Sequence, residues 1–475
     1  MTIQNVIRLC LVVMLVWLLM QVHWPVLVRE WKQQQKRRRA KRRKQARKGK
    51  KPKPFEGLTR QPICERCVME AERQDEEKKR EPPAKINHKR GRRREVDTRK
   101  QFCPEERCQY YGWLDRGNII SNGHPSGGQW RQMKCVACGK HFQETIGTIF
   151  YGSSVAAQDI MRGIAALCEG VSPRKVARIF EVDKDTVFGW LVEAAAHSET
   201  VVGYMVHNLH LSQVQMDELY ALLNGMRGED EGRSCCWVWV ATDPFSKLLL
   251  AIEVGDRSLD MAQQLVHAVV DVLAPGSVPL FLTDQLAAYG KALLTHFGCW
   301  VERVSEKSGR ILHRWMPVEQ LRYAQVKKRR RRRKIVAVTT KVVFGTKEAV
   351  RAALKTAGHR DQCGCCASVA FVERLNRTLR AHVPGLGRRE EGLAKTKQGL
   401  LRRLMLVMGY YNFCLPHLSL RRALPSPIPT KGNGSPKKWT PRTPAMAGGI
   451  TDHVWTMEEF LLFRVPPWRQ EATAA

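Results

Sequence analysis

Residues 211–219 read LSQVQMDEL, and residues 278–284 read VPLFLTD. Each is a short apolar and β-branched run that ends in acidic or turn residues, which is typical of a buried strand. Similar runs at 236–241 (CWVWVA) and 247–254 (KLLLAIEV) predict two further strands, and a last one is expected at 300–304. Amphipathic helices are predicted over 258–273 and 287–297. Three antiparallel strands, a helix, a parallel strand and further helices predict an α/β domain, a mixed sheet with flanking helices.

Acidic residues stand where two of these predicted strands end. Asp217 ends the first strand, with Glu218 beside it as a fallback, and Asp284 ends the fourth; Glu373 lies in the first turn of a helix predicted over 369–383. Carboxylates that converge repel one another unless cations neutralise them, and Mg²⁺ prefers carboxylate oxygen. We therefore expect two Mg²⁺ ions, or Mn²⁺, roughly 3.5–4 Å apart, acting on a phosphodiester. The alternative is that these three are unrelated members of a set of 45 acids. Asp243 lies in the same region and is interpreted as a turn residue before Pro244.

Two cysteine pairs predict a small metal-stabilised domain upstream of this core. Cys103 and Cys108 are followed, after 26 residues, by Cys135 and Cys138. Four thiolates in paired spacing suit a tetrahedral structural Zn²⁺ site, a zinc ribbon, because fewer than about 50 residues cannot build a sufficient core alone. Gly139 would let the backbone fold under the metal, and Phe142 would cap the core. Four unrelated core thiols are the alternative.

Helical patterns follow the cysteines. A helix is predicted over 155–167, a short one over 174–180 begun by Ser172 and Pro173, and another over 186–196 capped by Asp185. Two short helices joined by a tight turn are typical of a helix-turn-helix that docks in the major groove of DNA. The residues expected to face phosphates are Arg174, Lys175, Arg178 and Lys184. A plain helical bundle has the same pattern and remains the alternative.

Charge points to a polyanionic partner. The chain of 475 residues holds 80 Lys and Arg against 45 Asp and Glu, a net charge of +35, which argues against an ordinary small-metabolite enzyme. Residues 29–53 carry fifteen Lys or Arg and one Glu, a block expected to be disordered and to bind nucleic acid electrostatically. The preceding apolar stretch, residues 6–28, is interpreted either as a marginal membrane anchor or as an amphipathic packing helix.

Several segments have no assigned chemistry. Residues 306–345 are expected to be an irregular insertion with eight consecutive basic residues, Lys327 to Lys334, that either tracks DNA or forms a solvated loop. Six prolines between 424 and 447 argue against regular structure there, and a short helix is predicted at 456–463. No role is assigned to Cys64 and Cys67, or to Cys363, Cys365 and Cys366.

Taken together, these pieces resemble bacterial and archaeal insertion-sequence transposases of the DDE class that carry an N-terminal zinc ribbon and helix-turn-helix. The resemblance covers about 103–464 and rests on the two cysteine pairs with WRQ at 130–132, QMDEL at 215–219, LTD at 282–284, FVERLN at 371–376, and TPAM and TDHVW at 443–446 and 451–455. It implies a ribonuclease-H-like core with Asp217, Asp284 and Glu373 as the catalytic triad, and DNA contacts from Asn376 and Arg380 on the Glu373 helix. It also implies Mg²⁺-dependent strand transfer by a homodimer or larger assembly on double-stranded DNA.

The predicted protein is thus multidomain, in the order apolar segment (1–28), basic arm and linker (29–100), zinc ribbon (101–150), helix-turn-helix (151–200), catalytic core (205–415) and Pro-rich tail (416–475). The predicted function is a DNA transposase, cytoplasmic and nucleoid-associated, that binds terminal inverted repeats, cleaves DNA and transfers the strand. The alternatives are a zinc-ribbon DNA-binding regulator, an inactive transposase remnant, or a membrane-tethered DNA-binding protein.

Overall fold

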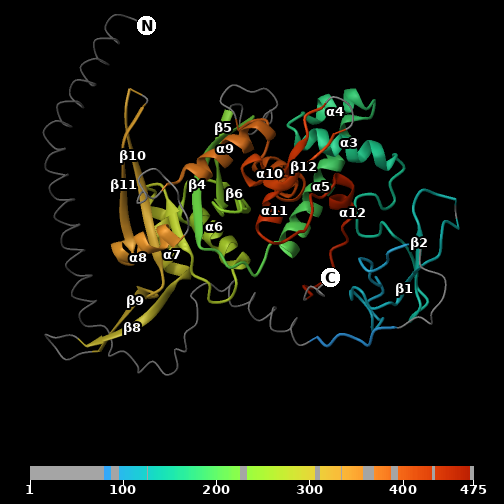
Figure 1. Ribbon diagram of the computed structural model, residues 1–475, viewed down its shortest axis with the longest axis horizontal. Coiled ribbons are helices and arrows are strands. Elements are labelled where there is room, and N and C mark those ends of the chain that lie inside the picture. The colour runs from blue at the N-terminus through green and yellow to red at the C-terminus, as the bar shows by residue number, and fades with distance from the viewer. Residues whose placement is uncertain are drawn as a thin grey trace, which may run out of the picture. The chain divides into compact units, whose positions relative to one another are not determined.

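The computed structural model describes residues 80–86, 96–125, 127–224, 233–304, 311–332, 334–356, 368–386, 394–430 and 434–470 (Figure 1). The chain divides into two units, Met1–Gln61 and Pro62–Ala475, and all described residues belong to the second. The apolar segment, the basic arm, Cys64, Cys67 and the three cysteines at 363–366 lie outside the described residues. No helix in the described ranges has both the length and the apolar character to cross a bilayer.

The cysteine-rich segment forms a small antiparallel sheet. Its strands are β1 (Ile119–Ser121), β2 (Gln132–Cys135) and β3 (His141–Gln143), in the order β1-β2-β3. Tyr110, Ile119, Met133 and Phe142 are buried together with three of the cysteines, and this cluster is separate from the main core. The expected role of Phe142 in the core is therefore confirmed.

Three helices follow: α3 (Ala157–Cys168), α4 (Pro173–Ile179) and α5 (Lys184–Met205). Helix α5 begins earlier than expected, because Asp183 rather than Asp185 is its N-cap and accepts a hydrogen bond from the backbone of Asp185. It also continues past the expected end at 196, where Ser198, Val201 and Val202 are buried. Ile179, the last residue of α4, is 65% exposed.

The central sheet has the strand order β11-β10-β7-β4-β5-β6 (Figure 1). Strands β4 (Gln213–Asn224), β5 (Arg233–Thr242) and β6 (Leu249–Gly255) are antiparallel, and β7 (Leu280–Thr283) pairs with β4 in parallel. This confirms the predicted mixed sheet, in which the first and fourth of the predicted strands pair with each other.

The expectation of an irregular insertion at 306–345 is wrong. Strand β10 (Arg322–Arg331) pairs in parallel with β7, and β11 (Lys334–Phe344) returns antiparallel beside it. The strand begins in apolar residues that lie before the basic run, and Tyr323, Ala324 and Val326 are buried in the core. The expected strand at 300–304 forms as β8 (Gly298–Val304), but it pairs with β9 (Ile311–Pro317) in a separate hairpin.

Helices cover both faces of the sheet. Helices α6 (Leu259–Val272) and α7 (Ala287–His296) pack together on one face, and Tyr289 of α7 lies against Trp239 of β5. Helix α9 (Ala370–His382) packs on β4 from the other face, and α8 (Lys347–Thr356) contacts β10. Helix α10 (Lys397–Gly409) packs on α5 and β6, so that one hydrophobic core joins the helical segment to the sheet.

The C-terminal segment is more regular than its prolines suggest. A π-helix (Tyr410–Cys414) and a 3₁₀ turn (Leu418–Leu420) follow α10. They lead to the strands β12 (Arg422–Ile428) and β13 (Lys437–Thr440), and then to the helices α11 (Pro444–Ala447) and α12 (Met457–Leu462). The two-stranded pairing skips register between Ala423 and Ile428, where Pro425 and Pro427 cannot donate ladder hydrogen bonds. The short helix predicted at 456–463 is confirmed, with Thr456 and Glu459 forming a capping box.

Candidate active site

Two adjacent acids on β4 face opposite sides of the sheet. Asp217 pairs with Val240 and Glu218 with Trp239, and β4 continues to Asn224, so the expectation that Asp217 ends its strand is wrong. Successive strand residues alternate faces, which directs Asp217 toward α9 and Glu218 toward α7. The buried residues Leu219, Ala221 and Leu223 hold the second half of the strand in the core.

Strand pairing brings Asp284 to the same place. Gln215 of β4 is level with Leu282 of β7, so two residues further on Asp217 is level with Asp284, which directly follows its strand as expected. The Asp284 carboxylate accepts a 2.9 Å hydrogen bond from the backbone N–H of Leu286, which fixes its direction. One carboxylate oxygen from each of Asp217, Glu218 and Asp284 lies within 4.8 Å of the others.

Helix α9 is tied to β4 at two points on the Asp217 face. The Gln215 side chain donates to the Ser368 carbonyl at 2.7 Å and accepts from the Val372 N–H at 3.2 Å. One turn further along, the Asn376 Nδ2 donates to Asp217 Oδ2 at 2.7 Å. These bonds set the position of the helix that carries Glu373 relative to the acids on the sheet.

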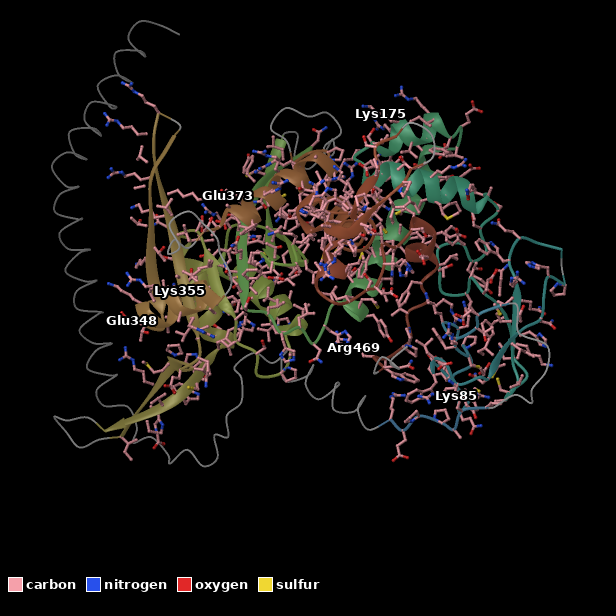
Figure 2. The ribbon with its side chains drawn as sticks, viewed as in Figure 1. Lys85, Lys175, Glu348, Lys355, Glu373 and Arg469 are labelled. Carbon is pink, nitrogen blue, oxygen red and sulfur yellow. The ribbon has the colours of Figure 1, made fainter. Side chains whose placement is uncertain are left out.

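Glu373 lies at the border of the cluster rather than inside it. Its Oε2 accepts a hydrogen bond from Lys328 Nζ at 2.6 Å, and Lys328 comes from β10 (Figure 2 labels Glu373 on α9). Its charge still acts on Asp217, and it is a weaker influence there than Glu218 or Asp284. The structure thus places two triad members together and the third beside them, paired with a lysine.

Burial and mutual repulsion perturb the acids. Burial, followed by the charges of Glu218, Asp284 and Glu373, raises the pKa of Asp217 from 3.8 to about 7. Burial and the charge of Asp284 also raise the pKa of Glu218, although Arg257 and Tyr289 act in the opposite direction. Groups of like charge held together in a low-dielectric site disfavour ionisation unless a cation compensates them.

Glu218 is the residue whose importance the sequence understated. Its side chain is 2% exposed, accepts from Tyr289 OH at 3.0 Å, and accepts from Arg257 Nε at 3.0 Å. Arg257 also lies 3.9 Å from Asp284 and over the Trp237 ring. The only sequence signal was that Glu218 follows Asp217 directly; its partners come from a loop and a helix far along the chain.

The acid cluster fits a divalent cation. Its donors are carboxylate oxygens, which Mg²⁺ and Mn²⁺ prefer. A second observation points the same way: Asn376 is 4% exposed, and its Oδ1 is buried without a hydrogen-bond partner among the described residues. A buried amide oxygen next to Asp217 is an oxygen that a metal-bound water could satisfy.

The four cysteines of the small sheet converge. The Cys103 and Cys138 sulfurs are 3.6 Å apart, those of Cys108 and Cys135 are 3.9 Å apart, and all four lie within 4.8 Å of one another. Gly139 has a φ of 76° and its N–H bonds the Cys135 carbonyl, which confirms the tight turn expected there.

The surroundings of these thiols shift their pKa values in different directions. Burial raises the pKa of Cys108 to about 11. Burial also acts to raise the pKa of Cys135, but hydrogen bonds from the Asn118 side chain and the backbone of Cys138 and Ala137 lower it overall. Asn118 is itself buried and donates to the Cys135 sulfur at 3.4 Å.

The predicted phosphate-facing residues share one surface. These residues are Arg174, Lys175, Arg178 and Lys184, and all four are exposed. They line a groove of about 1080 Å³. Its other wall includes Ala381, near the C-terminal end of α9, and Pro384, just beyond it. Of the two contacts expected on α9, Arg380 is exposed. The other, Asn376, is buried and donates a hydrogen bond to Asp217.

Comparison with known proteins gives little further information. No protein-family model matches the chain, and no curated protein matches it. A solved structure titled "Crystal structure of a pre-cleavage Mos1 transpososome" is 12% identical, with a TM-score of 0.12, over 29% of this chain and 56% of that one. Another, "Crystal structure of the Mos1 Strand Transfer Complex", is 11% identical, with a TM-score of 0.15, over 52% of this chain and 74% of that one. TM-scores this low do not establish a common fold.

Proposed function

We propose that this protein is a DNA transposase of the DDE class, with Asp217, Asp284 and Glu373 as its catalytic acids and Glu218 as a further member of the site. The observation that carries the proposal is the convergence of three carboxylates within 4.8 Å in the middle of a mixed sheet, where β7 ends beside β4, next to a helix that presents a fourth. The mixed sheet with helices on both faces is compatible with a ribonuclease-H-like core.

The residues of the site would hold divalent cations, Mg²⁺ or Mn²⁺. Asp217 and Asp284 supply oxygens from neighbouring strands, and Glu373 supplies one from α9 once Lys328 gives it up. When bound, such ions polarise a phosphodiester and stabilise its attacking and leaving oxygens. Cation binding fits the raised pKa of Asp217, because keeping these acids ionised together is unfavourable without cations.

The chain's own groups prepare this site. The Asn376 amide orients the Asp217 carboxylate, and the backbone N–H of Leu286 orients that of Asp284. Tyr289 and Arg257 donate hydrogen bonds to the Glu218 carboxylate, and these bonds fix where its oxygens point. Lys328, 13% exposed, is placed to meet a phosphate when it leaves Glu373.

The reaction that this site supports has two steps. Water attacks a phosphorus atom at the element end and displaces a 3′-oxygen, which leaves as a free 3′-hydroxyl. That hydroxyl then attacks a phosphorus atom of target DNA and displaces another 3′-oxygen. Both steps are in-line displacements at a phosphodiester, so one set of acids serves both.

The upstream domains would bind the element ends. A tetrahedron with Zn–S bonds of about 2.3 Å puts its sulfurs about 3.8 Å apart, and the two short sulfur separations are 3.6 and 3.9 Å. This agreement supports a structural Zn²⁺ in the small sheet, hence a zinc ribbon. Helices α4 and α5, with exposed cations, support a helix-turn-helix for terminal repeats. A homodimer or larger assembly follows, because two element ends must be joined.

The test is 3′-end nicking of a labelled terminal-repeat duplex by the full-length protein in Mg²⁺. Asp284→Asn and Glu373→Gln should each lose about 10²–10³ in rate, because each removes a charge while keeping shape. Asp260→Asn, an exposed acid in the first turn of α6, is the matched control and should keep wild-type activity. Asp243 is unsuitable as a control, because its buried carboxylate accepts from Ser246 and Phe245 in a turn.

The outcomes separate the candidate functions. DNA binding without nicking by the wild-type protein in Mg²⁺ or Mn²⁺ would identify a DNA-binding regulator or an inactive remnant. Nicking by Asp284→Asn at the wild-type rate would refute the assignment of the site.

A further inference from the structure

We propose that the groove beside α4 and the exposed face of α9 form one continuous phosphate-binding track, so that the DNA held in the groove is the same segment that is cleaved. This inference rests on the proposed function. It adds which surface of the chain leads the DNA to the acids and in which order the phosphates meet that surface.

The first step is that the groove ends on α9. Its walls are α4, the start of α5 and the end of α9, and its cations are Arg174, Lys175, Arg178 and Lys184. One acid, Asp183, also lines it, but its carboxylate already caps α5 through the Asp185 N–H. Four exposed cations around one engaged acid give a groove whose charge complements a phosphate backbone.

The second step is that the contact between α3 and α9 is close and fixed. The His382 Nδ1 donates to the Cys168 carbonyl at 2.9 Å. Gly170 has a φ of +84°, and a Cβ there would lie 2.9 Å from the Ala381 carbonyl. A side chain at Gly170 would therefore separate the two elements. The groove and the catalytic helix thus keep a defined spacing.

The third step is the face that α9 shows to solvent. Arg377 and Arg380 are exposed, and they follow Glu373 by four and seven residues, which places all three on one helix face. Ala381, in the groove wall, continues that face. Arg374 is also exposed, and it lines a small pocket with Phe371 and Tyr411.

The α9 part of this track gives the minimum separation between the groove and the acids. From Glu373 to Ala381 the helix advances eight residues, about 12 Å at 1.5 Å per residue. One strand of B-DNA advances about 3.4 Å per nucleotide, so 12 Å corresponds to three to four base pairs. A strand whose backbone lies against the groove cations therefore passes Arg380 and Arg377 before reaching the acids. Figure 2 labels Lys175 on α4 and Glu373 on α9, the two ends of the track.

The experiment uses the full-length protein and a 30-base-pair duplex selected from a randomised pool by binding to it. The salt dependence of affinity is measured in Ca²⁺ for Lys175→Ala, Arg377→Ala and Arg380→Ala. Each should lower the slope of log affinity against log salt by about 0.9, the loss of one phosphate contact. Lys355→Ala is the matched control: an exposed lysine near the end of α8, labelled in Figure 2, whose loss should leave the slope unchanged.

Ethylation interference on the same duplex then locates the contacts. Phosphates whose interference disappears in Arg377→Ala should lie between those lost in Lys175→Ala and the Mg²⁺-dependent nick, on one strand. An unchanged slope in Arg377→Ala, or Arg377 phosphates that do not lie between the Lys175 phosphates and the nick, overturns the track while leaving the proposed function intact. Failure of the wild-type protein to nick in Mg²⁺ overturns both.

Discussion

Replacing Asp217 by Asn should abolish nicking and yet stabilise the metal-free protein. Burial and three neighbouring acids raise the pKa of Asp217 from 3.8 to about 7. The folded chain therefore holds this proton more tightly than the unfolded chain does. Between about pH 4 and pH 7 the unfolded state binds fewer protons, so the free energy of unfolding falls as pH rises through that window.

The size of the effect follows from the shift. A difference of about three pH units, at 1.36 kcal/mol each, is at most about 4 kcal/mol of destabilisation, fully present above pH 7. Asparagine carries no charge at any of these pH values. Its Oδ1 can still accept from Asn376 Nδ2, so the link to α9 survives. Asp217→Asn should thus remove most of the loss that the wild-type protein suffers at high pH.

The assay is thermal unfolding of the full-length protein at pH 6 and pH 8 in buffer without Mg²⁺, repeated with Mg²⁺; EDTA is left out because it would also remove the proposed zinc. Without Mg²⁺ the wild-type midpoint should fall between pH 6 and pH 8 by a few degrees more than that of Asp217→Asn, because this interval covers about 1.4 kcal/mol of the effect. Mg²⁺ at pH 8 should raise the wild-type midpoint and leave the variant nearly unchanged. Asp260→Asn should behave as wild type. If Asp217→Asn is less stable than wild type without Mg²⁺ at pH 8, the reasoning from charge repulsion is refuted.

Three further outcomes are expected. Metal analysis of the full-length protein should give one zinc per chain, lost in Cys135→Ser; normal zinc content in that variant would contradict the four-thiolate site. Tyr289→Phe removes a hydrogen bond from Glu218 and should weaken Mg²⁺ binding, measured by calorimetry, about 10–100-fold, whereas unchanged affinity would show that Glu218 is not coupled to the metal. Deleting residues 1–60 removes the fifteen basic residues at 29–53 and should flatten the salt dependence of binding to random duplex, while preference for element ends persists; an unchanged slope would count against a DNA-binding arm.

Much of the core could be predicted from local patterns. The strand before Asp284 ends where expected, and the helix with Glu373 in its first turn forms as expected, because apolar periodicity and turn residues mark both. Pairing of β4 with β7 then brings together acids 67 residues apart. The cysteine spacing likewise predicted the convergence of four sulfurs, since few arrangements of two such pairs are compact.

Other features could not be predicted because they depend on which elements pack against each other in the folded chain. Strand β10 was hidden because its apolar half is short and a run of eight basic residues follows it. Because that strand was not predicted, Lys328 could not be placed beside Glu373. The two residues are 45 positions apart, and no local sequence pattern indicates their ion pair. The resemblance implied a DNA contact for Asn376, and only the fold shows that its side chain lies against Asp217.

The charges of the site predict that the proposed metal ions bind in two stages. Glu218 and Asp284 share Arg257, Glu373 has Lys328, and Asp217 has an amide but no ion pair with any described residue. Four carboxylates with two cations leave two negative charges, which one divalent ion balances. A second ion would leave the site positive unless more negative charge arrives. The phosphodiester supplies it, and the same phosphate can draw Lys328 away from Glu373 and free that carboxylate as a ligand. Binding of the second ion and binding of DNA should therefore favour one another, because each supplies the charge that the other lacks.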